Sequence, residues 1–207
     1  MPSLRKVVIV DYKLSNLFSV NNALKKININ AQISSYKKDI ASADLIILPG
    51  TGTFSAAMKN LRENDLLDNL ASHIKNGKPF LGICLGFQLL FSSSSEIKKT
   101  IGLNIFKSKI KKIKNETHAV PNIGWNKIKI IHKKNPKLKS EYFYFVHSYY
   151  ADILEKEQKI VSSYIEYQKN KVCSSITYNN IFATQFHPEK SGKKGLELMK
   201  NIIKFYK

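Results

Sequence analysis

The chain has 207 residues, of which 43% are apolar, and 34 Lys and Arg against 15 Asp and Glu give a formal net charge of +19. The hydrophobicity excludes a disordered chain, the small numbers of Gly and Pro exclude collagen-like and low-complexity sequences, and two cysteines exclude a disulfide scaffold. We predict one globular domain over residues 1–207.

The first half of the chain alternates strand patterns with helix patterns. Apolar runs predict buried strands, and apolar stripes at helical spacing predict helices. The strands are expected at 6–10, 31–34, 45–48 and 80–84, and the helices at 16–27, 54–61, 66–75 and 85–91. This order predicts an α/β fold with a mostly parallel, doubly wound sheet and helices on both faces.

The second half is dominated by short strand patterns. Residues 92–95 are predicted to be a loop, and one helix is expected near the end, at 195–205. Strands are expected between them at 105–113, 127–131, 142–146, 160–167, 172–178 and 181–186. Strands without intervening helices indicate antiparallel hairpins beside the parallel sheet.

The positive charge is almost entirely lysine, because Arg5 and Arg62 are the only arginines. Specific readers of phosphates and bases depend on the planar fork of arginine, so we favour a solvated basic surface over nucleic-acid binding. The residues from Met1 to Arg5 lead directly into a short apolar run. Because no signal or membrane-spanning pattern follows, we expect a cytoplasmic protein with no membrane association and with reduced cysteines.

The strongest local motif is Gly82-Ile83-Cys84-Leu85-Gly86, which lies between a predicted strand and a predicted helix. This is the nucleophile-elbow pattern G-x-C-x-G, in which glycines permit a tight turn and close approach of a substrate. The following helix N-terminus favours a thiolate. A buried structural cysteine is the alternative, and we prefer it for Cys173, which has no such context.

A cysteine nucleophile needs a base and a group that orients the base. His187-Pro188-Glu189 follows a predicted strand, and in extended backbone His187 and Glu189 point to the same side. We assign no role to His73, expected on a helix surface, or to His132, expected in a loop.

Oxyanion donors are the third requirement of acyl transfer. The loop Gly50-Thr51-Gly52 follows a buried strand and is expected to present free backbone N–H groups near the elbow. The N–H of Leu85, directly after the nucleophile, is the second candidate. An ordinary glycine turn is the alternative interpretation of the loop.

Taken together, these motifs resemble the class I glutamine amidotransferases, and more narrowly the glutaminase subunits of imidazole glycerol phosphate synthase. The resemblance covers nearly the whole chain. Its motifs are Asp11-Tyr12, Asn16-Leu17, Leu48-Pro49-Gly50, GICLGFQLLF at 82–91, VPNIGWN at 120–126, YFVHSYY at 144–150 and ATQFHPEKS at 183–191. It implies a flavodoxin-like sheet and no cofactor or metal.

The resemblance also implies roles for individual residues. Cys84 attacks the carboxamide of glutamine, His187 transfers the proton, and Glu189 orients His187. Gly50, Thr51, Gly52 and Leu85 form the oxyanion hole. The implied contacts to substrate glutamine are Gln88, Glu96, Ser148 and Tyr149. The ammonia then passes to a (β/α)₈-barrel cyclase subunit in a heterodimer, which Trp125, Asn126, Tyr144 and Lys190 face.

Some positions depart from the usual family pattern. Lys13 and Ser15 stand where glycines are usual, Asn122 where histidine is usual, and Gly192 where Gln or Ser is common. None is in the triad, so glutaminase chemistry is still implied. Two alternatives remain open, namely ammonia supply for sugar amidation in surface polysaccharide synthesis and a non-catalytic basic binding module. The densest basic run, at 107–114, lies outside every motif, so we expect it away from the active site.

Overall fold

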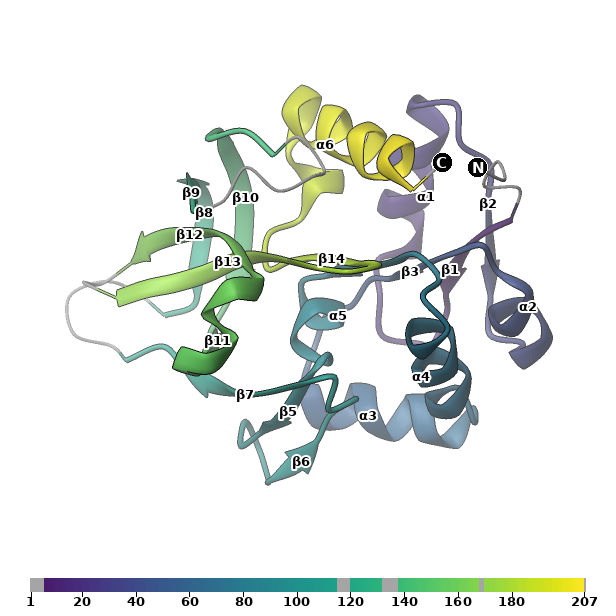
Figure 1. Ribbon diagram of the computed structural model, residues 1–207, viewed down its shortest axis with the longest axis horizontal. Coiled ribbons are helices and arrows are strands. Elements are labelled where there is room, and N and C mark those ends of the chain that lie inside the picture. The colour runs from purple at the N-terminus through teal and green to yellow at the C-terminus, as the bar shows by residue number, and fades with distance from the viewer. Residues whose placement is uncertain (1–5, 115–119, 132–137, 168–169, 207) are drawn as a thin grey trace.

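A central sheet forms the frame of the computed structural model, which describes residues 6–114, 120–131, 138–167 and 170–206. Within these residues it has eight strands (Figure 1). Five neighbouring strands are parallel, in the order β2 (Ala31–Ser34), β1 (Val7–Val10), β3 (Leu45–Leu48), β4 (Phe80–Ile83) and β14 (Ile181–Thr184). Antiparallel strands continue it as β13 (Asn170–Tyr178), β12 (Val161–Tyr167) and β9 (Lys129–Ile130).

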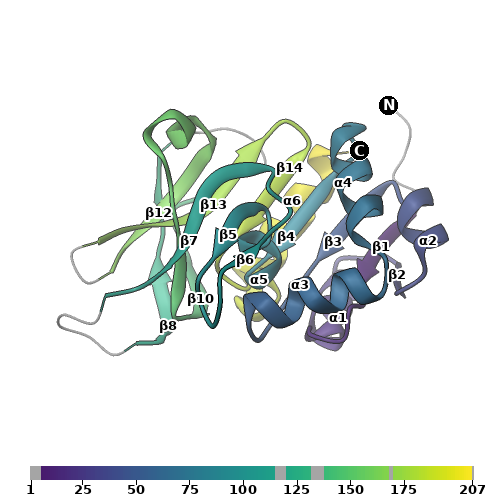
Figure 2. The same cartoon turned by 90° about the horizontal axis from the view of Figure 1, so that it is seen from below.

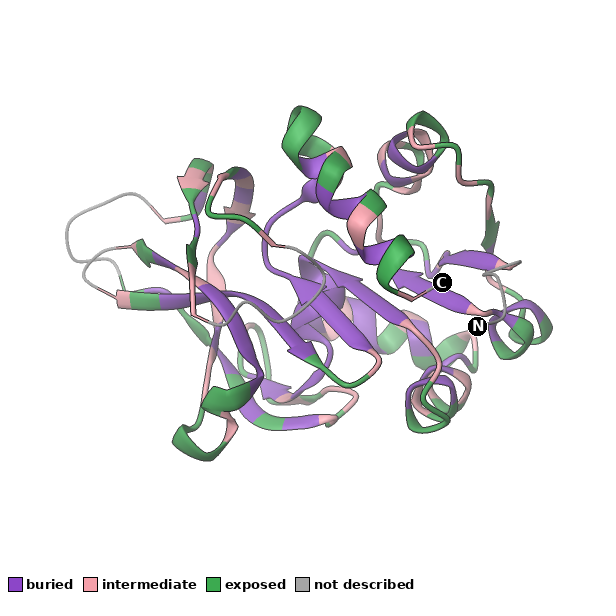
Figure 3. Cartoon of the chain, turned by 45° about the horizontal axis from the view of Figure 1, so that its top comes forward, coloured by how far each residue is buried: buried purple, intermediate pink, exposed green. Residues whose placement is uncertain are grey.

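Helices cover both faces of this sheet (Figure 1). One face carries α1 (Leu17–Lys26) and α6 (Gly192–Phe205). The other carries α2 (Lys37–Ser42), α3 (Phe54–Glu63), α4 (Leu67–Lys75) and α5 (Leu85–Gln88). Strand β1 contributes Val7 and Ile9 to the core between the sheet and helices α1 and α6. It contributes Val8 and Val10 to the core on the other face, as expected for a strand buried on both faces. The exposed residues of the helices lie on their outer sides (Figure 3).

Two smaller sheets come from the second half of the chain. One pairs β10 (Tyr142–His147) with β8 (Asn122–Lys127). The other has the order β11 (Tyr149–Asp152), β7 (Phe106–Lys112), β5 (Phe91–Ser94) and β6 (Thr100–Ile101). Strands β5, β6 and β7 lie below the central sheet in Figure 1 and in front of it in Figure 2. Short 3₁₀ helices span Glu155–Ile160 and Pro188–Lys190.

The predicted fold class is confirmed, with local differences. Residues 92–95, predicted to be a loop, contribute most of β5, where Ser92 Oγ donates to two carbonyl oxygens of β7. The helix predicted to reach residue 91 ends at Gln88. Helix α2 and strands β6, β8 and β11 were not predicted. Within the described residues no helix combines the length and apolarity needed to cross a bilayer.

A close backbone contact fixes helix α5 against strand β3. A Cβ atom at Gly86 would lie 1.8 Å from the carbonyl oxygen of Leu48, which no side chain tolerates. The strand before the helix is equally close, since a Cβ at Gly82 would lie 2.9 Å from the Gly86 carbonyl oxygen. The turn between β4 and α5 is therefore determined by backbone packing.

Substitution of Gly86 by alanine tests this packing. We expect Gly86→Ala to lower the free energy of unfolding by about 2 kcal/mol or more, because backbone must move. The melting temperature should fall by about 4–8 °C, measured by circular dichroism. Gly77→Asn is the control, because a Cβ there meets nothing within 4 Å and asparagine tolerates its φ of 74°. Equal melting temperatures for Gly86→Ala and the native chain would refute the argument.

Candidate active site

Cys84 occupies a sharp turn between strand β4 and helix α5. Its φ of 53° and ψ of −106° place a non-glycine residue in a strained region of the backbone map. The turn is held by its N–H, which donates to the Thr184 carbonyl oxygen at 2.7 Å. Such strain is typical of a nucleophile elbow, so the predicted position of Cys84 at the end of a central strand is confirmed.

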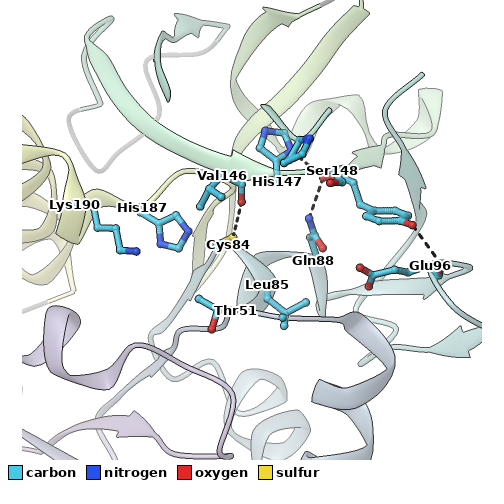
Figure 4. A pocket seen from close by; sticks show the side chains of 13 residues that line it. Thr51, Cys84, Leu85, Gln88, Glu96, Val146, His147, Ser148, His187 and Lys190 are labelled. Atoms are coloured by element: carbon cyan, nitrogen blue, oxygen red, sulfur yellow. Dashed lines mark hydrogen bonds between the residues drawn. The ribbon is translucent and has the colours of Figure 1, made fainter. Parts of the chain in front are cut away.

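His187 and Glu189 form a buried pair beside Cys84. His187 Nδ1 lies 2.7 Å from Glu189 Oε1, and both side chains are almost fully buried. The backbone N–H of His187 donates to the Tyr144 carbonyl oxygen, which ties the pair to strand β10. The other ring nitrogen, Nε2, is buried and has no hydrogen-bond partner among the described residues. Figure 4 shows the imidazole next to Cys84, so Nε2 is the atom available for proton transfer.

The two histidines near the site have opposite pKa shifts. Burial alone lowers the pKa of His187, but negative charge on Cys84 and the contact with Glu189 outweigh it and raise the pKa to about 10. Burial lowers the pKa of His147 to about 4, and its bond to the Tyr149 carbonyl oxygen offsets this only in part. At pH 7 His187 is therefore an imidazolium and His147 is neutral.

A pocket of about 440 Å³ opens at the elbow (Figure 4). Ten of the residues predicted for the site line it, namely Thr51, Gly52, Cys84, Leu85, Gln88, Glu96, Ser148, Tyr149, His187 and Lys190. Pro121, Val146 and His147 line it as well. The predicted residues that do not line it are Gly50, Glu189, Trp125, Asn126 and Tyr144. The structure therefore brings most of the predicted site residues to one cavity.

The predicted oxyanion loop differs in one detail from the expectation. The N–H of Thr51 is not free, because it donates to the Leu14 carbonyl oxygen at 2.9 Å. Gly50 is packed so tightly that a Cβ there would lie 2.2 Å from the Tyr12 hydroxyl. Gly52, with a φ of 92°, and Leu85, in the first turn of α5, both line the pocket.

The predicted substrate-binding residues already have partners in the fold. Gln88 Nε2 donates to the Tyr149 carbonyl oxygen at 3.0 Å and to Gln185 Oε1 at 2.9 Å, so its own carbonyl oxygen is the atom left for a ligand. Glu96 Oε2 accepts the Phe54 N–H at the start of α3. Ser148 lies between His147 and Tyr149 on the pocket wall, and its carbonyl oxygen accepts the N–H of Ile113.

The residues predicted to face a partner come from strands β8 and β10 and from the 3₁₀ helix at Pro188–Lys190. Trp125 is 55% exposed and meets Tyr144 edge to face, with ring centroids 6.1 Å apart. Asn126 alternates to the opposite side, where its amide donates to Asn122 Oδ1. Lys190 is exposed at the mouth of the pocket. This exposure shows that Trp125 is not a core residue.

Three further outcomes concern residues outside the predicted set. His73 is buried, with Nε2 against the Pro79 carbonyl oxygen, so its expected surface position is wrong. Cys173 is buried in β13, as expected, whereas His132 lies outside the described residues. The basic run at 107–114 was expected away from the site, and none of its residues lines the pocket. Its end lies close to the site, because Lys112 is paired with Tyr149 in the β7–β11 register.

Sequence reasoning missed two polar residues next to the elbow. Gln185 is fully buried, and its Nε2 donates to Cys84 Sγ at 3.7 Å. His147 is buried on the pocket wall. Both residues belong to the quoted motifs. Each is a polar residue at the end of an apolar strand pattern, and that position could have indicated a role in the site.

The chain is similar in sequence to proteins of one family. The profile of the family "Glutamine amidotransferase class-I" matches residues 8–205. "Imidazole glycerol phosphate synthase subunit HisH" of Caldanaerobacter subterraneus subsp. tengcongensis is 43% identical over 200 residues, which is 94% of this chain and 95% of the relative. The protein of the same name from Pyrococcus furiosus is 43% identical over 202 residues, 95% of this chain and 97% of the relative.

Solved structures share the fold at low sequence identity. A structure described as a glutamine amidotransferase has a TM-score of 0.74 at 17% identity and covers 95% of this chain and 97% of its own. The structure of PurLQS from Thermotoga maritima has a TM-score of 0.72 at 19% identity, with full coverage of both chains. The fold, the elbow and the family profile define a class I glutamine amidotransferase. The chain belongs to that family and, within it, to the HisH group of relatives.

The opposite protonation of the two histidines is a direct prediction. In an NMR titration, His187 should remain doubly protonated from pH 6 to above pH 8, because its pKa lies near 10. His147 should remain neutral over the same range, because its pKa lies near 4. Glu189→Gln removes one of the groups that raise the pKa of His187, so that pKa should fall. A neutral His187 at pH 7 in the native chain would contradict the interpretation.

Proposed function

We propose that the chain is the glutaminase subunit of an imidazole glycerol phosphate synthase and supplies ammonia for histidine biosynthesis. The observation that carries the proposal is the strained Cys84 in one pocket with His187, whose ring contacts the buried carboxylate of Glu189. The names of the relatives at 43% identity support the particular synthase. A single domain over the chain is part of the proposal, since one central sheet joins both halves.

The proposed reaction proceeds through a thioester. The Cys84 sulfur attacks the side-chain carboxamide carbon of glutamine, and the electron pair of its C=O bond moves to oxygen. When the C–N bond breaks, His187 gives its Nε2 proton to the leaving nitrogen and ammonia departs. Water then adds to the thioester carbon while His187 takes its proton, and glutamate leaves as the C–S bond breaks. Glu189 orients the ring and stabilises the imidazolium throughout.

The remaining pocket residues are assigned to charge stabilisation and substrate binding. The N–H groups of Leu85 and Gly52 are the proposed oxyanion donors, with Gly50 and Thr51 shaping the loop. Gln88 offers an acceptor oxygen, and Glu96 offers the carboxylate oxygen that does not accept from Phe54. Both atoms suit the ammonium group of glutamine. Ser148 and Tyr149 complete the wall on the other side.

The partner is proposed to be a (β/α)₈-barrel cyclase subunit bound over the mouth of the pocket. The exposed Trp125 and the half-buried Tyr144 form an aromatic pair on the β8–β10 sheet, and the exposed Lys190 lines the pocket. Aromatic residues of this kind dominate the energies of protein interfaces. The amide of Asn126 already bonds Asn122, so we assign it to the support of this face. Ammonia released at Cys84 then enters the partner without meeting bulk water.

Replacement of the nucleophile tests the chemistry. In complex with the barrel subunit, Cys84→Ala should lose glutamine hydrolysis by on the order of 10³-fold or more, because no thioester forms. The measurement is glutamate release, together with mass spectrometry of the glutamyl adduct on the native chain. Cys173→Ala is the control and should retain activity, because its thiol lies in the core. Residual native-like hydrolysis in Cys84→Ala would exclude the mechanism.

The acceptor of the ammonia is tested separately. The native pair should convert the ribulose-phosphate-substituted aminoimidazole carboxamide into imidazole glycerol phosphate and AICAR. Amidation of a nucleotide sugar in place of this conversion would favour the polysaccharide alternative.

The aromatic pair generates a prediction on assembly. Trp125→Ala should raise the dissociation constant for the barrel subunit on the order of tenfold, because a large exposed ring is removed from the proposed interface. Calorimetric titration measures the change. Tyr36→Ala is the matched control, since Tyr36 is 67% exposed at the start of α2. Helix α2 lies at the opposite end of the molecule from β8 (Figure 1). Equal affinities for the two variants would place the interface elsewhere.

A further inference from the structure

A series of hydrogen-bonded polar side chains begins on strand β8 with the half-buried Asn126. Asn126 Nδ2 donates to Asn122 Oδ1 at 3.1 Å, and Asn122 Nδ2 lies 3.1 Å from His147 Nε2. Because an amide nitrogen can only donate, Nε2 of His147 is an acceptor and the ring proton is on Nδ1. That proton is directed at the Tyr149 carbonyl oxygen, 2.9 Å away. The low pKa of His147 keeps this tautomer neutral.

The series continues from the same carbonyl oxygen to the nucleophile. Gln88 Nε2 donates to the Tyr149 carbonyl oxygen and also to Gln185 Oε1. With Oε1 accepting, the amide nitrogen of Gln185 points to Cys84 Sγ at 3.7 Å. Every link joins a donor to an acceptor, so reversal of any amide would place like groups against each other. The series fixes the orientation of all its members.

These links join segments that are far apart in the sequence. They connect strands β8, β10 and β11, helix α5 and the residue that follows β14. Asn122, His147, Gln88 and Gln185 are all buried, so water does not compete for their hydrogen bonds. Figure 4 shows His147, Gln88 and Cys84 around the pocket. The carbonyl oxygen of Val146, 3.9 Å from Cys84 Sγ, belongs to the wall that His147 holds.

We propose that Asn122 and His147 are positioning residues for glutamine hydrolysis and that Gln185 supports the nucleophile directly, as parts of one hydrogen-bond relay. The proposal rests on the proposed function for the reaction it serves. Gln185 supplies an N–H to the Cys84 sulfur before attack and after thioester cleavage. His147 and Asn122 keep that N–H aligned through Gln88. They also hold the Val146 carbonyl oxygen of the pocket wall 3.9 Å from Cys84 Sγ.

The first test measures the reactivity of Cys84 in the free chain and needs no partner. Gln185→Met and His147→Phe should slow alkylation of Cys84 by iodoacetamide on the order of tenfold, since a hydrogen bond to a charged sulfur is lost or misaligned. Asn122→Leu should slow it less, because it stands further along the relay. Ser162→Ala is the control, a buried hydroxyl in β12 that bonds Thr177 and should leave the rate unchanged. Cys84→Ser identifies the labelled site.

The second test separates positioning from general stability. In the glutaminase assay with the barrel subunit, His147→Phe should lower kcat on the order of tenfold while KM changes less. His147→Asn should recover part of kcat, because its amide keeps a donor for the Tyr149 carbonyl oxygen. The combined variant of Asn122→Leu and Gln185→Met should lose less than the product of the single losses, because the two residues act through one relay.

The outcomes distinguish the relay from the proposed function. Native alkylation rates in both Gln185→Met and His147→Phe would overturn the relay, whatever the assay shows. If the native pair hydrolyses no glutamine, the proposed function fails, and the alkylation rates still decide the relay. If His147→Phe does not fold, Gln185→Met carries the test, because methionine matches glutamine in size. Multiplicative losses in the double variant would also refute a shared relay.

Discussion

The close packing of helix α5 on strand β3 is the constraint on which the site depends. A glycine at position 86 lets the helix backbone touch the Leu48 carbonyl oxygen, and no other residue leaves room for that contact. The chain must then reverse sharply after strand β4, which forces Cys84 into its positive φ. The central sheet holds both β3 and β14 beside β4, so the loop after β3 and the His187 segment after β14 meet the same turn. Site geometry therefore follows from sheet order and one backbone contact.

Within this frame, neighbours decide the charge of each histidine. Both His187 and His147 are buried, and burial alone lowers the pKa of each. His187 has Cys84 on one side and Glu189 on the other, so its charged form is stabilised. His147 faces an amide and a carbonyl oxygen, which suit a neutral ring. The same residue type is thus charged at one position and a neutral hydrogen-bond link at the other.

The sequence was sufficient for features that depend on local patterns. The elbow glycines around Cys84, the His187–Glu189 spacing and the parallel strands are all encoded within a few residues of each other. Features that depend on distant partners were not accessible. The serines of β5 have a loop-like composition and become a strand only because β7 lies beside them. The N–H of Thr51 is taken by Leu14, and Gln185 reaches Cys84 through a strand that is remote in sequence. The proposed roles of the site residues remain predictions.

The strong positive charge also has a structural explanation in part. In β7 the lysines at 107, 109 and 111 are exposed, whereas Phe106, Ser108 and Ile110 between them are buried, which is the alternation of a strand with one wet face. On the exposed side, Lys111 forms an ion pair with Asp152 of the neighbouring β11. The densest basic run is thus the outer face of a strand whose last residue, Lys112, pairs with Tyr149, and the next residue, Ile113, donates its N–H to the Ser148 carbonyl oxygen. Its charge keeps one side of the strand in water while Phe106 and Ile110 on the other side pack in the core, so this lysine pattern does not require an anionic ligand.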